Sequence, residues 1–488
     1  MQNAPNWLKE FAIETFGEND KDALIAGTTI TLIVVSIGLG IASVRRLWIG
    51  VAGTLVFGVI GVWAALTRPG ASFSDIWPSV VGTAAGVGVL VLLLGHRFVS
   101  RPASAVADHP ADGSSRPVSP ELPAVRRPGR APAGFDRRGF LISAGAVAGG
   151  AIVAGGLGRR LQGRYDISGA RAAVQLPAPA SPAAALPAGT DFGTAGISSF
   201  VTSNADFYRV DTALVAPRIT PSDWKLKITG MVDNPFEISF EELLDRDLIE
   251  RDVTLVCVSN EVGGQYAGNA RWLGAPLKTL LEEAGVQAGA DQLVSRSVDD
   301  WTAGSPVELV MDGRDAMVAI GMNGEPLPVE HGFPARLVVP GLYGFTSATK
   351  WVTELELTTF DAYDAYWLRR GWAQIAPIKT MARIDTPKGL GKLRPGTVPI
   401  GGIAWAVHRG IDGVQVSIDD GGWQDAQLAT VPGVDTWRQW MLPWEATSGR
   451  HTITARAIDS TGEVQTSERK EPIPDGAQGW HTIVVTVP

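Results

Sequence analysis

The residue best suited to carry chemistry is Cys257, the single cysteine of the 488-residue chain. It ends a β-branched run, Val253–Val258, and leads into a loop with Gly263-Gly264. A thiol that closes a buried strand and opens into a glycine-rich loop suits a soft metal ion. One cysteine excludes an intrachain disulfide and a multi-cysteine metal site, and no local base stands ready to activate a catalytic thiolate. The alternative is a small buried apolar residue.

Segments around Cys257 resemble segments of the sulfite oxidase family of molybdenum enzymes and follow the same order along the chain. The chain resembles a membrane-anchored bacterial member of that family. The segments are Asn204–Pro217, Trp224–Gly230, Leu255–Gly264, Ala270–Pro276, Met322–Val339 and Lys350-Trp351. In the C-terminal part, Gly402–Ala406, Val414–Gln424 and Gly479–Val484 are similar to that family's dimerisation domain. The resemblance extends over residues 190–488.

The resemblance implies that the Cys257 thiolate ligates molybdenum in a molybdenum–molybdopterin cofactor, and that Arg209 and Trp372 stand near the metal. It further implies a cofactor-binding set consisting of Phe207, Tyr208, Arg209, Val210, Asp211, Cys257, Asp299, His331, Arg336, Ala348, Thr349 and Lys350. A pterin phosphate needs cations and backbone donors, which Arg336 and Lys350 could supply. Taken singly, Arg336 could form an ordinary ion pair, Lys350 could be a solvent-exposed side chain, and His331 could be a turn residue.

The chain departs from the family's pattern where sulfite oxidases bind their anion. Glu261 and Val262 occupy the places of a basic pair that follows the ligand cysteine, and Trp372 replaces a tyrosine that follows a double arginine. Sulfite needs converging charged donors, so we expect a poor sulfite oxidase unless Arg271 or Arg370 restores the site.

Helix and strand patterns alternate over residues 191–372 and predict an α+β domain that positions these residues. Lys225–Val232, Arg336–Val339 and Trp351–Leu357 are typical of strands, while Pro276–Ala284 is typical of a helix. Ser239–Leu248 predicts a helix with Ser239 as N-cap and Glu242 three residues on. Over residues 373–488, short alternating runs separated by Gly/Asp/Ser turns predict an immunoglobulin-like, dimerisation-type β-sandwich; they are Gly413–Ile418, His451–Ile458 and His481–Val487.

Residues 1–98 contain three apolar stretches, Ala23–Val44, Leu47–Leu66 and Ile76–Phe98, and each is about 20 residues long, as a bilayer requires. Buried core helices are the alternative. A disordered cytoplasmic linker is expected over 99–136 because its Pro, Ala, Arg and Ser cannot build a core. Residues 137–160 resemble a twin-arginine signal anchor, or an ordinary fourth span. Residues 161–190 predict a Pro/Ala linker without a core, which would hold the catalytic part away from the membrane.

Arginines cluster at Arg45-Arg46 and after the third stretch, so the positive-inside rule places those parts in the cytoplasm. The N-terminus and the domain after residue 165 would then lie outside. The protein is therefore expected in the cytoplasmic membrane, multi-pass, with its catalytic domain extracytoplasmic. We expect a lipid bilayer as its environment.

The balance of 42 Lys+Arg against 50 Asp+Glu argues against a nucleic-acid partner. The expected activity is two-electron oxygen-atom transfer on a small molecule, in either direction. Reduction of an S-oxide or N-oxide is the alternative to oxidation, and a cofactor-free surface binding module is a second alternative. The sequence contains no haem motif, so electrons are expected to pass through a separate cytochrome or quinone-linked partner. The dimerisation-type domain implies a homodimer.

Overall fold

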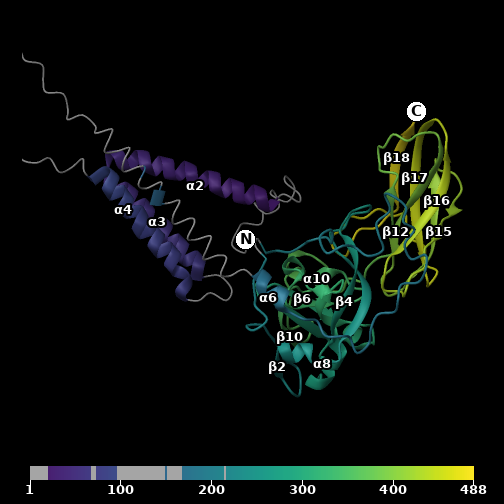
Figure 1. The fold of residues 1–488 in the computed structure, drawn as a ribbon, viewed down its shortest axis with the longest axis horizontal. Coiled ribbons are helices and arrows are strands. Elements are labelled where there is room, and N and C mark those ends of the chain that lie inside the picture. The colour runs from purple at the N-terminus through teal and green to yellow at the C-terminus, as the bar shows by residue number, and fades with distance from the viewer. Residues whose placement is uncertain (1–19, 67–72, 96–144, 146–148, 151–166, 214–215) are drawn as a thin grey trace, which may run out of the picture. The chain divides into compact units, whose positions relative to one another are not determined.

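A computed structural model describes residues 20–66, 73–95, 145, 149–150, 167–213 and 216–488 (Figure 1). The chain divides into two compact units, Met1–Tyr165 and Asp166–Pro488. The expected linker over 99–136 and most of the expected signal anchor over 137–160, including Arg137 and Arg138, lie outside the described residues.

The N-terminal unit contains the helices α2 (Asp20–Arg45), α3 (Leu47–Leu66) and α4 (Trp77–Gly95), with a short η2 (Phe73–Ile76) before α4. The stretch Ala26–Arg45 of α2 and all of α3 are long and apolar enough to cross a bilayer, with mean hydropathies of 2.0 and 2.1. In α4 the apolar part is shorter, Trp77–Val91. Instead of the three expected spans, the described residues therefore hold two helices of sufficient length. Signal sequences and core helices share these properties.

The second unit begins with an α+β domain built on two five-stranded sheets. The first sheet has the order β2-β1-β10-β5-β6, in which only β1 and β10 are parallel. The second has the order β3-β4-β7-β8, with β9 paired to β7. The strands are β1 (Lys225–Gly230), β2 (Phe236–Ser239), β3 (Ile249–Val256), β4 (Ala267–Pro276), β5 (Gln292–Ser297), β6 (Thr302–Pro306), β7 (Met317–Met322), β8 (Glu325–Pro326), β9 (Arg336–Val338) and β10 (Val352–Thr358).

Short helices connect these strands, namely α6 (Ile167–Ala173), α7 (Phe240–Leu244), α8 (Leu277–Ala284), α9 (Val307–Met311), η3 (Val329–His331), α10 (Gly344–Ser347) and η4 (Leu368–Arg370). The expected capping box forms at α7, where the Ser239 hydroxyl accepts from the Glu242 N–H and the Glu242 carboxylate accepts from the Ser239 N–H. The helix is shorter than expected because its chain turns at Asp245 to enter β3. α8 ends at Gly285, whose φ of +70° is left-handed, a common helix stop.

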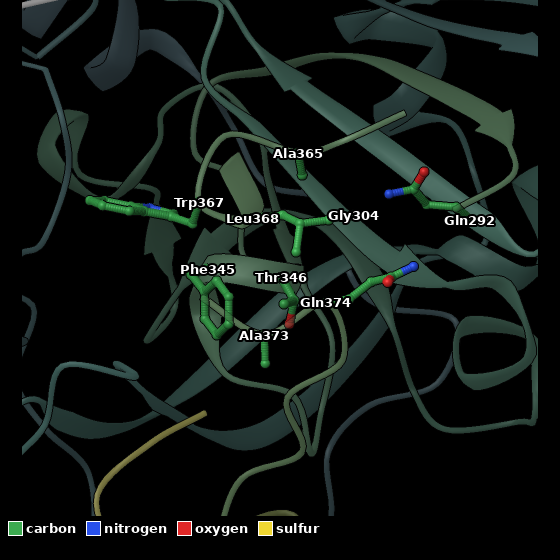
Figure 2. A pocket seen from close by; sticks show the side chains of 9 residues that line it. All are labelled: Gln292, Gly304, Phe345, Thr346, Ala365, Trp367, Leu368, Ala373 and Gln374. Atoms are coloured by element: carbon green, nitrogen blue, oxygen red, sulfur yellow. The ribbon is translucent and has the colours of Figure 1, made fainter. Parts of the chain in front are cut away.

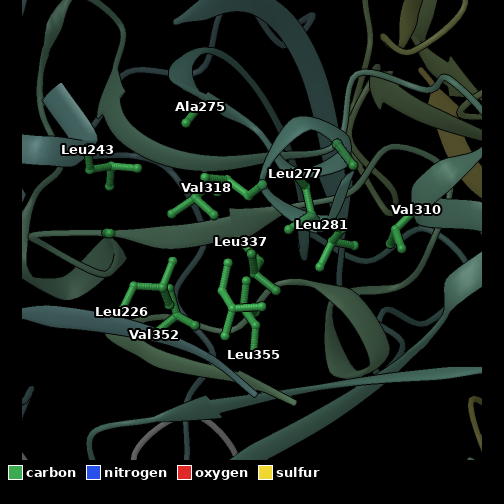
Figure 3. Close-up of a cluster of buried hydrophobic side chains, with 14 of the residues drawn as sticks. Leu226, Leu243, Ala275, Leu277, Leu281, Val310, Val318, Leu337, Val352 and Leu355 are labelled. Carbon is green, nitrogen blue, oxygen red and sulfur yellow. The ribbon is translucent and has the colours of Figure 1, made fainter. Parts of the chain in front are cut away.

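The core of the domain draws on both sheets and on α8 (Figure 3). Leu226 and Ile228 alternate with exposed lysines along β1 and point into this core, as the sequence pattern predicts. Trp224 is buried, and its indole N–H donates to the Val352 carbonyl at 2.8 Å. Burying each such large apolar side chain contributes about 1.5–3 kcal/mol. This core fixes β10, which begins two residues after Lys350.

The C-terminal part is a β-sandwich of two four-stranded antiparallel sheets, ordered β11-β12-β16-β15 and β14-β13-β17-β18. Its strands are β11 (Met381–Thr386), β12 (Gly396–Trp405), β13 (Ile411–Ile418), β14 (Gln424–Asp425), β15 (Gln427–Leu428), β16 (Arg438–Ala446), β17 (Gly449–Asp459) and β18 (His481–Val487). Val414, Trp440 and Ile453 belong to its core, which draws on both sheets. The expected β-sandwich is therefore present; its immunoglobulin type stays a prediction.

The α+β domain and the sandwich share one buried apolar cluster. Val256 and Val258, on either side of Cys257, belong to the same cluster as Ile403 and Trp405 of β12. Trp437 joins the two parts further, since its backbone N–H donates to the Thr254 hydroxyl at 2.7 Å. The two parts are therefore packed together around the strand that leads to the cysteine.

The Pro/Ala segment before residue 190 is extended, as expected, but it packs against the second unit. Ser181 pairs with Ile249 in a parallel β-bridge, and the Ser181 N–H donates to the Leu248 carbonyl at 3.2 Å. Further along, the Thr430 hydroxyl of the sandwich donates to the Ala188 carbonyl at 2.8 Å. We call residues 174–190 the strap. The strap is therefore bound through backbone groups that find partners on and next to β3.

Candidate functional site

Cys257 leaves the end of β3 and begins a loop that returns at Tyr266. Its backbone N–H donates to the Tyr266 carbonyl at 2.9 Å, and both the N–H and the hydroxyl of Ser259 hydrogen-bond to its sulfur. Cys257 is partly buried. Burial therefore raises the pKa of the Cys257 thiol, while Ser259 and the charge of Lys350 act in the opposite direction. A cation bound to the sulfur would favour the thiolate further.

The segment Phe207–Asp211 lies close to this cysteine. Phe207 is buried, stacks on Tyr208 at 5.2 Å between ring centroids, and meets the rings of Trp272 and His331 edge-on. Burial raises the pKa of Tyr208, the charge of Cys257 raises it further and that of Arg336 lowers it, so the phenol lies within electrostatic range of both.

Arg336 is a buried cation, only 5% exposed, on β9. Its guanidinium donates only to carbonyls, those of Leu337, His331 and Ala348, at 3.2–3.4 Å, and lies over the Trp272 ring at 5.0 Å. Among the described residues it forms no ion pair with a carboxylate. Burial lowers the pKa of Arg336 to about 10. Such a cation is costly to bury unless an anion joins it.

Lys350 and Arg209 share a single carboxylate. Both donate to Oδ2 of Asp211 at 2.9 Å, and Lys350 also donates to the Glu330 carbonyl at 3.1 Å. The side chains of Lys350 and Asp211 are 10% and 4% exposed, whereas that of Arg209 is 40% exposed. Burial lowers the pKa of Lys350 to about 8 in spite of Asp211.

His331 is buried beside these cations. Its Nε2 lies 3.1 Å from the Asn204 carbonyl, which can only accept, so this nitrogen carries the proton. Burial and the charge of Arg336 lower the pKa of His331 to about 4. The ring is therefore neutral at physiological pH and acts as a donor and a packing surface.

The remaining cofactor-set residues lie at different distances from this group. Ala348 offers its carbonyl to Arg336, and the Thr349 hydroxyl is buried against that of Ser295 at 2.6 Å. Val210 is exposed between Arg209 and Asp211. Asp299 lies in the turn between β5 and β6, where its carboxylate accepts from the Trp301 N–H at 3.4 Å, and no contact joins it to the others.

The charges at this site fit an anionic group that carries its own metal. Lys350 and Arg209 share the Asp211 carboxylate, and the buried Arg336 has no carboxylate partner among the described residues, so positive charge is in excess, which suits a phosphate. The described residues contain no cluster of three His, Cys, Asp or Glu able to hold a metal ion. A metal at Cys257 would therefore take its remaining ligands from a bound group, as a metal–pterin cofactor provides. The residues present fit that group.

Two of the three residues that depart from the family's anion-binding pattern pack on apolar neighbours. Val262 and Trp372 both pack against the cluster that contains Val256 and Val258, while Glu261 is exposed. The Trp372 ring contacts Phe345 and Trp367 at centroid distances of 5.6 and 6.1 Å. These two rings also line a small cavity of about 10 Å³, with the amides of Gln292 and Gln374 opposite them (Figure 2).

Neither arginine that could have restored an anion pocket is free to do so. Arg271 binds both oxygens of Asp252 at 2.9 and 2.7 Å. Arg370 lies 3.6 Å above the Tyr366 ring and donates to the Tyr366 carbonyl at 2.6 Å. Both side chains are thus held by local partners.

Several residues that complete the site were not singled out from the sequence. The Asn204 carbonyl accepts a hydrogen bond from His331, and the Trp272 ring lies under the Arg336 guanidinium. Ser259 hydrogen-bonds to the cysteine sulfur. All three lie within segments that resemble the family, so the segments indicated their region but not their contacts.

Comparisons with known proteins agree with this geometry. Residues 213–367 match the oxidoreductase molybdopterin binding domain. Human mitochondrial sulfite oxidase is 27% identical over 319 residues, 55% of this chain and 57% of that protein. The oxidoreductase YuiH of Bacillus subtilis is 32% identical over 149 residues, 30% of this chain and 72% of YuiH.

A solved structure extends the likeness to three dimensions. The sulfane dehydrogenase SoxCD of Paracoccus pantotrophus superposes with a TM-score of 0.53 at 26% identity, covering 60% of this chain and 84% of that chain. The chain spans 57% of human mitochondrial sulfite oxidase and 83% of the sulfite oxidase of Arabidopsis thaliana. A cofactor-free binding module is excluded by these likenesses and by the charged, cysteine-containing site. The protein is a molybdopterin-dependent enzyme, and the chain belongs to the sulfite oxidase family of molybdopterin-binding oxidoreductases.

Proposed function

We propose that this enzyme transfers an oxygen atom to or from a small neutral or weakly charged substrate, and that sulfite is a poor substrate. The observation that carries the proposal is the packing of Val262 and Trp372, which we call the wall, on the apolar cluster that contains Val256 and Val258. Neither Arg271 nor Arg370 is free to replace the missing cations. When bound, the molybdenum cofactor supplies the two-electron chemistry. The direction that this wall favours is reduction of an organic S-oxide or N-oxide.

The chain's own residues have distinct tasks in this proposal. Cys257 is the thiolate ligand, and Arg336, Lys350 and Arg209 neutralise the pterin phosphate, with Asp211 holding two of them in place. His331, Phe207 and Tyr208 form a rigid surface for the pterin, with Ala348 and Thr349 contributing backbone groups. Trp372 and Val262 exclude water from the substrate. The two electrons and two protons of each reduction come from a separate cytochrome or quinone-linked carrier and from water.

Steady-state assays of the purified, molybdenum-loaded chain with artificial electron carriers test this proposal. We expect turnover with a panel of sulfoxides and N-oxides, and weak turnover with sulfite. Two missing charge-assisted hydrogen bonds would lower specificity for sulfite by about two to four orders of magnitude. Sulfite turnover comparable to that of dedicated sulfite oxidases would contradict the proposal that Val262 and Trp372 disfavour sulfite.

We also propose that the N-terminal helices anchor the enzyme in the cytoplasmic membrane, with the catalytic unit outside. Support comes from the apolar length of α2 and α3 and from the arginine distribution. Replacing Arg137-Arg138 by two lysines should retain the cofactor-loaded unit in the cytoplasm, measured by protease accessibility on intact cells. Unchanged export would leave only a plain membrane anchor. The family likeness of the sandwich supports a homodimer.

A further inference from the structure

The loop that follows the cysteine, residues 257–266, is closed by its own hydrogen bonds; we call it the cysteine loop. The Asn260 N–H donates to the Cys257 carbonyl at 3.0 Å, and the Tyr266 N–H donates to the Asn260 side chain at 2.8 Å. The Gly264 N–H donates to the Glu261 carbonyl at 2.9 Å. These bonds leave the Gly264 carbonyl pointing out of the loop, toward the sandwich.

Arg383 of β11 binds that carbonyl. Its Nη1 donates to the Gly264 carbonyl at 3.0 Å, its Nε to Asp385 at 2.7 Å, and its Nη2 to the Ser198 hydroxyl at 2.9 Å. The second oxygen of Asp385 accepts from the Ser198 N–H at 2.9 Å. Arg383 and Asp385 are only 2% and 3% exposed. One guanidinium therefore joins the cysteine loop, β11 and the chain before Phe200.

His481 of β18 contacts the same loop at Gly263. Its Nδ1 accepts from the Ile384 N–H at 2.8 Å, so the proton of the neutral ring is on Nε2. That nitrogen faces Gly263, whose φ is +85° and on which a Cβ would collide with the imidazole. Burial and the charge of Arg383 lower the pKa of His481 to about 4, so the ring stays neutral. The sandwich thus fits closely against Gly263 and Gly264.

We propose that the sandwich positions the cysteine loop through Arg383, which is a positioning residue for Cys257, Glu261 and Val262. This inference rests on the proposed role of Cys257 as the metal ligand, but not on the identity of the substrate. A guanidinium can donate in three directions within one plane, which a lysine cannot. A buried charge bound on all sides has little freedom to move. Arg383 touches neither the cysteine nor the wall residues, so it acts through the Gly264 carbonyl.

The single cysteine makes the test direct, because alkylation of the full chain can modify only Cys257. The rate of reaction with iodoacetamide is measured by mass on the cofactor-free chain, well below its unfolding temperature. The double variant Arg383→Met, Asp385→Asn removes the hydrogen bond from Arg383 to the Gly264 carbonyl and leaves no buried carboxylate unpaired. We expect alkylation to accelerate about ten- to hundredfold, since a charge-assisted hydrogen bond that holds the loop closed is lost.

The matched control is Arg409→Met with Asp459→Asn. Arg409 also binds a buried carboxylate, that of Asp459 at 3.0 Å, together with the Thr380 hydroxyl, but it contacts no residue of the cysteine loop. This control should lower the melting temperature and leave the alkylation rate unchanged. Equal alkylation rates in both double variants would overturn the proposal and reduce Arg383 to a structural role.

If the double variant fails to fold, the single variant Arg383→Lys replaces it in the alkylation experiment. Lysine can keep the charge beside Asp385 but loses the planar contact with Gly264, so alkylation should again accelerate. An unchanged rate would refute the positioning role. In the molybdenum-loaded chain, the paramagnetic resonance signal of the metal should shift in this variant. Because alkylation is read without cofactor or substrate, failure of the proposed oxygen-atom transfer would leave this result intact, and the two failures are distinguishable.

Discussion

The buried positive charges of Lys350 and Arg336 should make the cofactor-free enzyme less stable than it could be. Lys350 is 10% exposed, and burial lowers its pKa from 10.5 to about 8, although it shares Asp211 with Arg209. We therefore expect Lys350→Met to stabilise the cofactor-free chain and, at the same time, to weaken retention of the cofactor.

The size of the effect follows from the pKa of Lys350. The difference between 10.5 and about 8 corresponds to about 3 kcal/mol at neutral pH. Between pH 8 and 10.5 the unfolded chain binds more protons than the folded chain, so the free energy of unfolding of the parent rises with pH in this window. Below pH 8 Lys350 is charged in both the folded and the unfolded chain, so the full destabilisation of about 3 kcal/mol is present. The Lys350→Met variant has no titrating amine at this position, so its free energy of unfolding should not rise with pH in this window.

Thermal unfolding of the cofactor-free chain, followed by tryptophan fluorescence at pH 7 and pH 10, measures both effects. At pH 7 the Lys350→Met variant should melt several degrees higher, and at pH 10 the advantage should shrink. The control is Lys227→Met, because Lys227 is 58% exposed on β1. Loss of one charge-assisted contact should weaken cofactor retention about ten- to hundredfold. A Lys350→Met variant that is less stable than the parent at pH 7 would refute the reasoning.

Three further outcomes are expected. Cys257→Ser should abolish activity and lower the molybdenum content while the melting curve stays close to that of the parent; a fully active serine variant would exclude the ligand role. Val262→Arg with Trp372→Tyr should raise kcat/KM for sulfite about ten- to hundredfold through a restored charged contact, and no change in steady-state assays would count against the wall as the determinant. Burial lowers the pKa of His481 to about 4, below the ordinary 6.5, so the parent should lose up to about 2 kcal/mol as pH falls from 6.5 to 4. His481→Gln should flatten this acid loss in melting experiments, and an equally steep loss would contradict it.

Local patterns in the sequence predicted the elements that position the site. The alternation in Lys225–Val232 gave β1, and the capping pair of Ser239 and Glu242 placed the start of α7. The position of Cys257 at a strand end also follows from its β-branched neighbours, although the strand stops one residue earlier, at Val256. Such features depend on residues close in sequence, which is why they can be predicted from it.

Contacts between distant segments could not be predicted in this way. Nothing about Arg383 distinguishes it from other strand arginines, and its partner Gly264 lies 119 residues away. The placement of Trp272 under Arg336 depends on how β4 and β9 both pair with β7. The strap looked like a free spacer because its composition cannot form a core, yet it needs none, since β3 offers it hydrogen-bonding partners.

The attachment of the strap has a consequence for proteolysis of the enzyme. Proteases cleave chain that can leave the surface and enter their active sites, and Pro/Ala-rich segments between domains are often accessible in this way. Here Ser181 is bonded to β3 and Ala188 to Thr430 of the sandwich, so both ends of the exposed stretch between them are held down. The stretch between Ser181 and Ala188 should therefore resist cleavage as long as the second unit stays folded. Cleavage within that stretch would then report the loss of the support that the strap gives to the strand that leads to Cys257.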